Sequence, residues 1–174
     1  MSWPNAPKWP TWAVALLFVG VAIVTVAIGF ASSIPSTKVL GKSASSGPST
    51  PPGPVFSVVW TVLYALAGCA MAFQGLTATK AAHWVSLGLL GLVVVLCFAW
   101  PQIWVEAVVK KRLAFGAPAW TIAAMLLVAA PGLTLVPSTT VAALWAPLVA
   151  WLIVALGLCL QAQSQERLPI HPQI

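Results

Sequence analysis

The stretch from Leu113 to Gln165 decides the fold class of this chain. It reads LAFGAPAWTIAAMLLVAAPGLTLVPSTTVAALWAPLVAWLIVALGLCLQAQSQ and contains no charged residue. One membrane-spanning helix needs about 20 apolar residues, so the stretch is too long for a single crossing and fits a hairpin of two. The residues that break the helix between the two crossings are Pro131, Gly132, Pro137 and Ser138. The stretch therefore predicts transmembrane helices at about 114–135 and 141–160.

Three further apolar stretches precede this hairpin, at about 12–30, 55–76 and 84–105. Each is long enough to cross about 30 Å of hydrocarbon. A cleaved signal peptide is the alternative for the first stretch, but the apolar part of a signal peptide is shorter. Pro101 predicts a kink in the third stretch, because it lacks an N–H and its ring clashes with the preceding turn. The segment 36–54 is rich in Ser, Pro and Gly and predicts a long loop.

The composition agrees with a membrane protein. Charged residues make up 6% of the 174 residues and hydrophobic residues 60%, whereas soluble domains are about 25% charged. These values exclude a soluble enzyme, a disordered tail and a disulfide scaffold. The sequence therefore predicts an all-α membrane protein that forms a single bundle of five transmembrane helices.

The basic residues predict the orientation of this bundle. Five crossings would place Lys8 and Lys80 on one side of the membrane. The other side would hold Lys38, Lys42, Lys110, Lys111, Arg112 and Arg167. By the positive-inside rule, we expect the first loop and the C-terminus to face the cytosol. The net charge of +6 is scattered over loops, so we expect no nucleic-acid partner. Bacterial, mitochondrial and plastid membranes all remain open.

Reactive side chains are few and isolated. Cys69, Cys97 and Cys159 lie in apolar stretches without a metal-ligating neighbour, and we interpret them as core residues. Glu106 lies four residues before Lys110, which predicts an ordinary ion pair on a helix surface. The sequence therefore predicts no enzyme, no catalytic residue, no metal site and no covalently bound cofactor.

Aromatic side chains suggest a binding site. Near the predicted membrane boundaries lie Trp3, Trp9, Trp12, Trp84, Trp120 and Trp145, which we interpret as membrane anchors. Within the predicted spans lie Trp60, Tyr64, Trp100, Trp104 and Trp151. Their N–H and O–H groups need partners that lipid does not provide, so we expect them to face the bundle interior. There they either line a ligand site or pack the core.

Small residues on the second predicted helix indicate a close helix contact. Gly68 and Ala72 are one turn apart, on a face that also nears Ala65. Helices in lipid associate through close backbone approach, which small residues permit. We therefore expect Gly68 to lie where another helix or another protomer packs.

Three short motifs occur in order along the chain. The second predicted helix opens with Pro51, Pro52, Gly53, Pro54, Val55 and Phe56, followed by Trp60, Leu63 and Tyr64. The third carries Pro101, Gln102, Ile103 and Trp104, followed by Lys110, Lys111 and Arg112, and the fifth carries Pro147, Trp151, Ala155 and Leu158. Together the motifs resemble the tryptophan-rich sensory protein and translocator protein family, also called the peripheral benzodiazepine receptor family. The resemblance covers most of the sequence.

This resemblance implies a five-helix bundle, often dimeric, with a pocket for porphyrins, sterols or related hydrophobic molecules. By matching positions, the pocket residues are Trp60, Trp104, Trp151 and Ala155, and Tyr64 and Trp100 share their helix faces. The loop residues Pro51, Pro52 and Pro54 would act as a lid. We expect a porphyrin or a lipid to be bound without a covalent bond.

The departures from the family pattern affect the polar positions of the pocket. Pro54 stands where the family has Trp, Pro101 where it has Asn, Leu148 where it has Tyr, and Cys159 where it has Asn. The family's cholesterol signature is absent as well, because it needs a Tyr close before a basic residue. Two functions follow from these observations. One is binding and transport of tetrapyrroles, sterols or similar molecules, and the other is an accessory structural subunit of a larger membrane complex. Membrane lipids, a hydrophobic small molecule, and a homodimer or larger membrane complex are the expected partners.

Overall fold

The computed structural model describes residues 10–43, 53–110 and 112–166, and this part of the chain is almost entirely helical. The helices are α1 (Thr11–Ser43), α2 (Gly53–Thr77), α3 (Ala81–Trp104), α4 (Ala117–Thr134) and α5 (Thr139–Glu166). A π-helical turn, Val105–Val109, continues α3. The described residues contain no β-strand. The predicted all-α fold class is confirmed.

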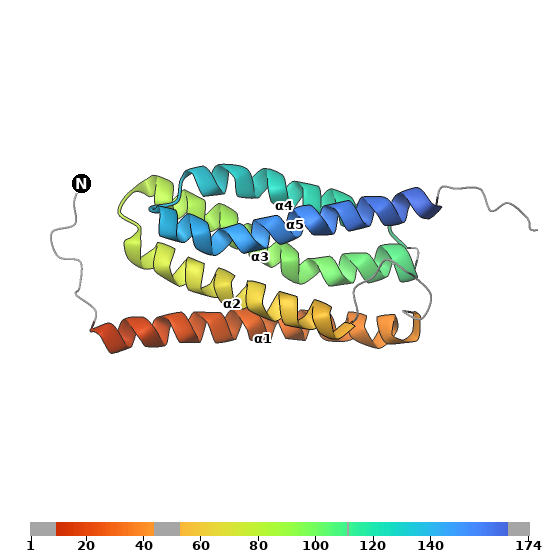
Figure 1. The fold of residues 1–174 in the computed structure, drawn as a ribbon, viewed down its shortest axis with the longest axis horizontal. Helices are drawn as coiled ribbons and strands as arrows, with labels where there is room; N and C mark the ends of the chain where they lie inside the picture. The colour runs from red at the N-terminus through yellow and green to blue at the C-terminus, as the bar shows by residue number, and fades with distance from the viewer. Residues whose placement is uncertain (1–9, 44–52, 111, 167–174) are drawn as a thin grey trace, which may run out of the picture.

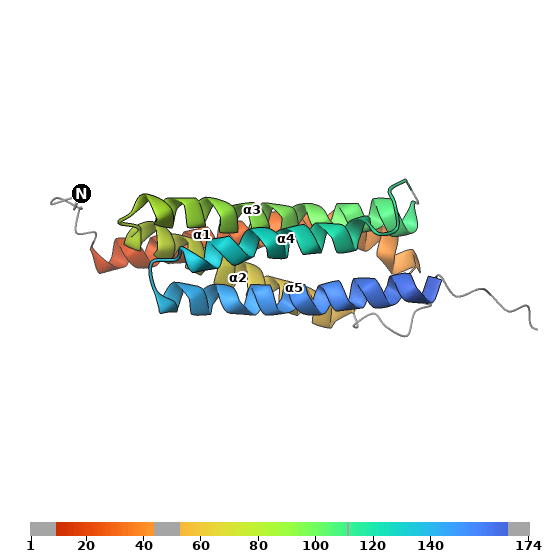
Figure 2. The ribbon, with the colours of Figure 1, turned by 90° about the horizontal axis from the view of Figure 1, so that it is seen from above.

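The five helices lie side by side along the long axis of the molecule (Figure 1). Helix contacts form a closed ring in the order α1, α2, α5, α4, α3, and α3 returns to α1. Helix α2 also contacts α3 across the ring. The view turned by 90° shows the same bundle from above (Figure 2). The order in space therefore differs from the order in the chain, because α5 packs between α2 and α4.

Within the described part of the chain, four segments are long and apolar enough to cross a membrane. They are Val58–Thr77, Ala81–Ala107, Ala117–Thr134 and Thr139–Ser164. The apolar part of α1 is shorter and covers Leu16–Ala31. Large apolar side chains such as Leu16, Leu127 and Ile153 are exposed on the outside of the bundle, where hydrocarbon rather than water is the compatible solvent. The chain is therefore an integral membrane protein.

The first loop is shorter than predicted, so the predicted loop 36–54 was wrong in its bounds. Helix α1 continues to Ser43, and α2 begins at Gly53. Residues 36–43 contain no proline, and adding a residue to an existing helix is far easier than starting one. Pro54 falls in the first turn of α2, where the missing N–H removes no helical hydrogen bond. Pro51 and Pro52 of the predicted lid lie outside the described residues.

The α4–α5 hairpin is confirmed, but its turn lies later than the first breakers. Helix α4 runs through Pro131 and Gly132 and ends at Thr134. Helix α5 then begins at Thr139 and continues to Glu166, beyond the predicted end at residue 160. Neither Pro131 nor Gly132 therefore ends α4 by itself.

A buried polar network joins four helices near the α2–α3 and α4–α5 turns. Gln74 on α2 is fully buried, and its Nε2 donates to Oγ of Ser86 on α3 at 2.7 Å and to the carbonyl of His83 at 3.2 Å. The indole N–H of Trp145 on α5 donates to Oε1 of Gln74 at 3.2 Å. The Ser86 hydroxyl donates to the carbonyl of Gly132 on α4 at 2.6 Å. These buried side-chain donors are therefore satisfied within the protein.

This network corrects the interpretation of Trp145 as a membrane anchor. Its side chain is 0% exposed and is among the largest fully buried ones. Gln74 supplies an acceptor inside the bundle, so the indole has no need of the membrane boundary. Trp84 and Trp120, in contrast, are 55% and 76% exposed, in agreement with anchoring. Trp3 and Trp9 lie outside the described residues.

The expected close contact at Gly68 is confirmed, and it joins α2 to α1. A Cβ atom placed on Gly68 would lie 2.7 Å from Cα of Ala22 and 3.0 Å from Oγ1 of Thr25. The nearest obstacle is therefore backbone, which cannot turn away as a side chain can. The absence of a side chain at Gly68 sets the approach of α1 to α2.

We expect Gly68→Ala to lower the thermal midpoint in detergent, because overpacking of a tight contact costs typically about 1–3 kcal/mol. The matched control is Gly157→Ala on α5. A Cβ there meets nothing within 4 Å, and alanine is favoured over glycine in a helix by about 1 kcal/mol. The control should therefore be neutral or stabilising. An unchanged midpoint in Gly68→Ala would contradict the contact.

We expect Gln74→Leu to lower the free energy of unfolding by about 1–3 kcal/mol, because it leaves the buried N–H of Trp145 without its acceptor. Adding Trp145→Phe should recover part of this loss, since the unpaired donor is then removed. Gln161→Leu, at an exposed position of α5, is the control. Chemical unfolding in detergent measures these three variants and Trp145→Phe alone, and strictly additive effects of the two single substitutions would argue against the hydrogen bond.

Candidate ligand-binding site

The predicted site residues lie on α2, α3 and α5. Tyr64 is 5% exposed and belongs to the core. The remaining five are partly buried and pack against that core: Trp60, Trp100, Trp104, Trp151 and Ala155. The expectation that these aromatic side chains face the bundle interior is confirmed. Because α2 packs on both α5 and α3, side chains from all three helices can contact one another.

A continuous series of ring contacts crosses the bundle from α5 to α3. The ring of Trp151 meets that of Trp60 edge-on, with centroids 6.5 Å apart. Trp60 is followed by Tyr64 at 5.2 Å, and Tyr64 by Phe98 of α3 at 5.0 Å. Phe98 was not among the predicted site residues, because its spacing of two residues from Trp100 places it on another face of the helix. We call Trp60, Tyr64, Phe98 and Trp151 the aromatic series.

Trp100 and Trp104 form a second pair. Their ring centroids are 5.4 Å apart, as the spacing of four residues predicts. The indole N–H of Trp100 donates to the carbonyl of Pro118 on α4 at 3.2 Å. This hydrogen bond holds Trp100 against α4. Of the five predicted aromatic residues, three thus belong to the aromatic series and two form this separate pair.

Tyr64 has a structural role within the aromatic series. Its hydroxyl donates to the carbonyl of Cys97 at 3.3 Å. That carbonyl lies four residues before Pro101, which has no N–H to donate to it. Tyr64 therefore supplies the hydrogen bond that Pro101 removes from α3. On the other side, a Cβ atom on Gly29 of α1 would collide with the Tyr64 ring, so α1 closes tightly over this residue.

Trp151 differs from Trp100 and Trp145, whose indole N–H groups donate to acceptors in the protein. Its Nε1 is buried and has no hydrogen-bond partner among the described residues. Ala155 follows one helical turn later and is partly buried. The site thus combines aromatic rings, a small side chain and a buried donor. Such a site can bind a flat apolar molecule that carries one acceptor atom.

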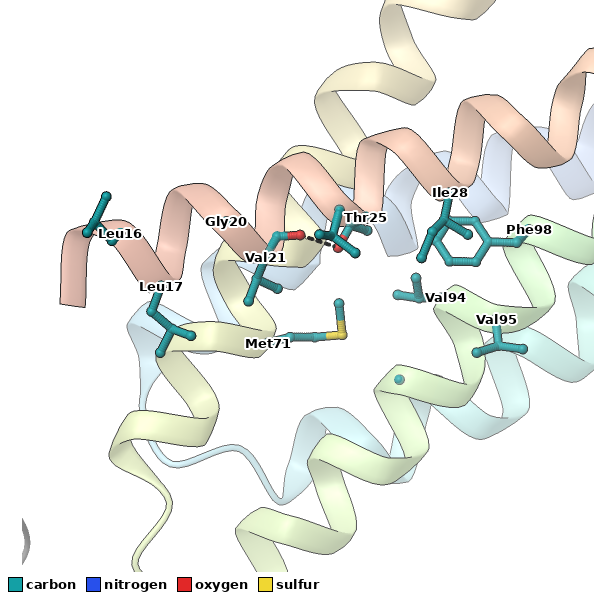
Figure 3. A pocket seen from close by; sticks show the side chains of 12 residues that line it. Leu16, Leu17, Gly20, Val21, Thr25, Ile28, Met71, Val94, Val95 and Phe98 are labelled. Carbon is teal, nitrogen blue, oxygen red and sulfur yellow. Dashed lines mark hydrogen bonds between the residues drawn. The ribbon is translucent and has the colours of Figure 1, made fainter. Parts of the chain in front are cut away.

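Two grooves on the bundle lie away from these residues. The first has a volume of about 620 Å³ and lies between α1, α2 and α3 (Figure 3). The second is formed by Ala13, Val14, Leu16, Leu17 and Leu76. None of the six predicted site residues lines either groove. Phe98 lines the first groove and also contacts Tyr64, so the first groove and the aromatic series share this residue.

The ionisable and sulfur side chains form no second site in the described part of the chain. Glu106 pairs with Lys110 at 2.5 Å, and the predicted ion pair is confirmed. Cys97 and Cys159 are buried in the core as expected, and Cys69 is half-buried. Among the described residues, no group of three or more His, Cys, Asp or Glu side chains could hold a metal ion.

Comparison with known proteins adds to this geometry. A model of the TspO/MBR family matches residues 13–164. The match begins in the first turn of α1 and ends in the last turn of α5. It therefore includes all three motifs noted in the sequence. No curated protein and no solved structure matches the chain. The match covers well over half of the sequence, and the chain therefore belongs to the TspO/MBR family.

Proposed function

We propose that this membrane protein of the TspO/MBR family binds a planar hydrophobic molecule inside the bundle. The ligand would be a tetrapyrrole such as a porphyrin, a sterol, or a molecule of similar shape. Trp60, Tyr64, Trp151 and Ala155 would line the site, with Trp100 and Trp104 at its α4 side. The role is binding, with transport as its extension, and not catalysis.

The buried N–H of Trp151 carries this proposal. Buried donors in folded proteins nearly always have an acceptor, and an exception calls for an explanation. In a membrane the cost of leaving such a group unpaired is not relieved by bulk water. A carboxylate or hydroxyl oxygen of a bound molecule would supply the missing acceptor. Porphyrins and sterols both combine a large apolar body with such oxygen atoms.

The surroundings of Trp151 support a flat ligand. The ring of Trp60 stands nearly perpendicular to that of Trp151, at an interplanar angle of 86°. Two perpendicular rings offer one face and one edge to a third ring, an arrangement that aromatic contacts favour. Ala155 lies one turn further along the same face, and its side chain is small, so it would hinder a ligand there less than a larger side chain.

The charge distribution supports binding or passive passage. Within the middle of the described spans there is no Asp, Glu, Lys, Arg or His. Ion-coupled carriers and proton pumps place such groups at mid-depth. A molecule that moves through this bundle would therefore move down its own gradient.

An accessory structural subunit is the second candidate function. Leu148 and Cys159, which stand at polar positions of the family pattern, are both buried in the hydrophobic core. This loss of polar groups would weaken recognition of the family's ligands. A stoichiometric set of membrane proteins that copurifies with the chain, without a bound pigment, would favour this role.

We expect protoporphyrin to quench tryptophan fluorescence of the purified protein in a saturable titration. Trp151→Phe keeps a ring but removes the N–H, and it should weaken binding about tenfold, the loss of roughly one buried hydrogen bond. Ala155→Phe should abolish binding because it fills the site. Trp84→Phe, at an exposed position, is the control. If the parent protein binds no protoporphyrin, or if both site variants bind as the parent does, the binding role fails.

We also propose that the first loop and the C-terminus face the cytosol, in a bacterial, mitochondrial or plastid membrane. The charges of the described residues support this orientation, since Lys38, Lys42, Lys110 and Arg112 lie toward the bundle end where α1 and α5 terminate, and Lys80 lies toward the other.

Single cysteines in a background without the native ones test this orientation. A membrane-impermeant maleimide added outside intact cells or organelles should fail to label Ser45→Cys and Ser164→Cys. It should label Thr79→Cys in the α2–α3 turn. Labelling of one of the first two without the other would contradict the five-span topology, and the reverse pattern would invert the orientation.

A further inference from the structure

We propose that the groove between α1 and α3 is a second binding site, which holds an acyl chain of an anionic phospholipid with the headgroup at Lys80. This site shares Phe98 with the aromatic series, contains none of the six predicted site residues, and takes a different class of ligand. It does not depend on the function proposed above.

The first groove is suited to hydrocarbon. Figure 3 shows α1 and α3 as its two walls, with the side chain of Met71 from α2 between them. The lining is aliphatic apart from Phe98 and Thr25. The hydroxyl of Thr25 donates to the carbonyl of Val21 in its own helix at 2.7 Å, so it is already engaged. A ligand that needs polar contacts finds none along these walls, whereas an acyl chain needs none.

Two glycines indicate that the space in the groove belongs to another molecule. Gly20 on α1 and Gly91 on α3 both line it. A Cβ atom at either position would meet nothing within 4 Å, so packing within the chain does not require glycine there. Empty space beside apolar walls forfeits dispersion contacts. Both positions lie within the apolar parts of their helices. The acyl chain of a membrane lipid is therefore suited to fill the space beside them.

The length of the groove fits an extended chain. The second groove shares Leu16 and Leu17 with the first, so the two grooves adjoin along α1. Together they follow α1 from Ala13 to Ile28, a distance of about 22 Å at 1.5 Å per residue. One leaflet of the hydrocarbon core is about 15 Å deep. The path is therefore long and narrow, and it reaches from the membrane boundary past the depth of one leaflet.

The charge at the outer end of this path selects the headgroup. Leu76 lines the second groove one residue before α2 ends at Thr77. Lys80 follows in the turn, precedes α3, and is exposed. Among the described Lys, Arg, Asp and Glu residues, it is the one at this end of the bundle. A phosphatidylglycerol headgroup at the same level is negatively charged and would pair with it.

Native mass spectrometry with palmitoyl-oleoyl phosphatidylglycerol as the probe tests the site. We expect a lipid adduct on the parent protein, and Gly20→Leu and Gly91→Leu should each reduce it at least about tenfold by filling the groove. Gly157→Leu is the matched control, because its Cβ also meets open space but lies on α5. Lys80→Gln should reduce the preference for phosphatidylglycerol over phosphatidylcholine about fivefold, the typical effect of one basic residue at a membrane surface.

Two results would overturn the proposal. One is an adduct that survives both leucine substitutions at the parent level. The other is a parent protein that is dimeric without lipid and becomes monomeric in Gly20→Leu and Gly91→Leu, which would assign the groove to a second copy of the chain. Thermal midpoints and protoporphyrin titrations of the same variants show whether the bundle and the aromatic site remain intact. A failed porphyrin titration in the parent leaves the lipid result unaffected.

Discussion

The hydrogen bonding of Gln74 is the main constraint on this fold, since a polar side chain within hydrocarbon must find its partners in the protein. Its amide group binds Ser86 of α3 and accepts from Trp145 of α5, and Ser86 binds the backbone of α4. The bond between Gln74 and Trp145 requires α5 to lie beside α2, and the short α4–α5 turn keeps α5 beside α4. The order of the helices in the ring and the hydrogen bonding of the Gln74 amide group therefore depend on each other. Apolar packing alone would tolerate other orders, because lipid and core are equally apolar.

The same constraint shapes the candidate site. Pro101 frees a backbone carbonyl in α3, and Tyr64 supplies the donor that it lacks. Trp100 finds a carbonyl on α4. Trp151 departs from this pattern, since its buried N–H has no acceptor among the described residues. This buried donor beside several aromatic rings is the observation on which the proposed binding role rests.

Hydropathy and charge were sufficient to predict five helices, the α4–α5 hairpin and the ion pair of Glu106, because these depend on local composition and spacing. Backbone crowding at Gly68 was also predictable, since small residues one turn apart mark close helix contacts. The burial of Trp145 was not, because its partner Gln74 is distant in the chain and isolated polar residues give no periodic signal. Phe98 and the groove were missed for a related reason: both arise from the ring order of the helices, which no single segment encodes.

Phe98 is shared by the two proposed binding sites. Its side chain lines the groove between α1 and α3, and its ring contacts that of Tyr64. A molecule that shifts this ring from either site changes the free energy of the other site. Such linkage is reciprocal, so the factor by which an occupant of the groove alters affinity in the bundle interior also acts in reverse. The affinity of the proposed interior site would then depend on the lipids around the protein as well as on the protein itself.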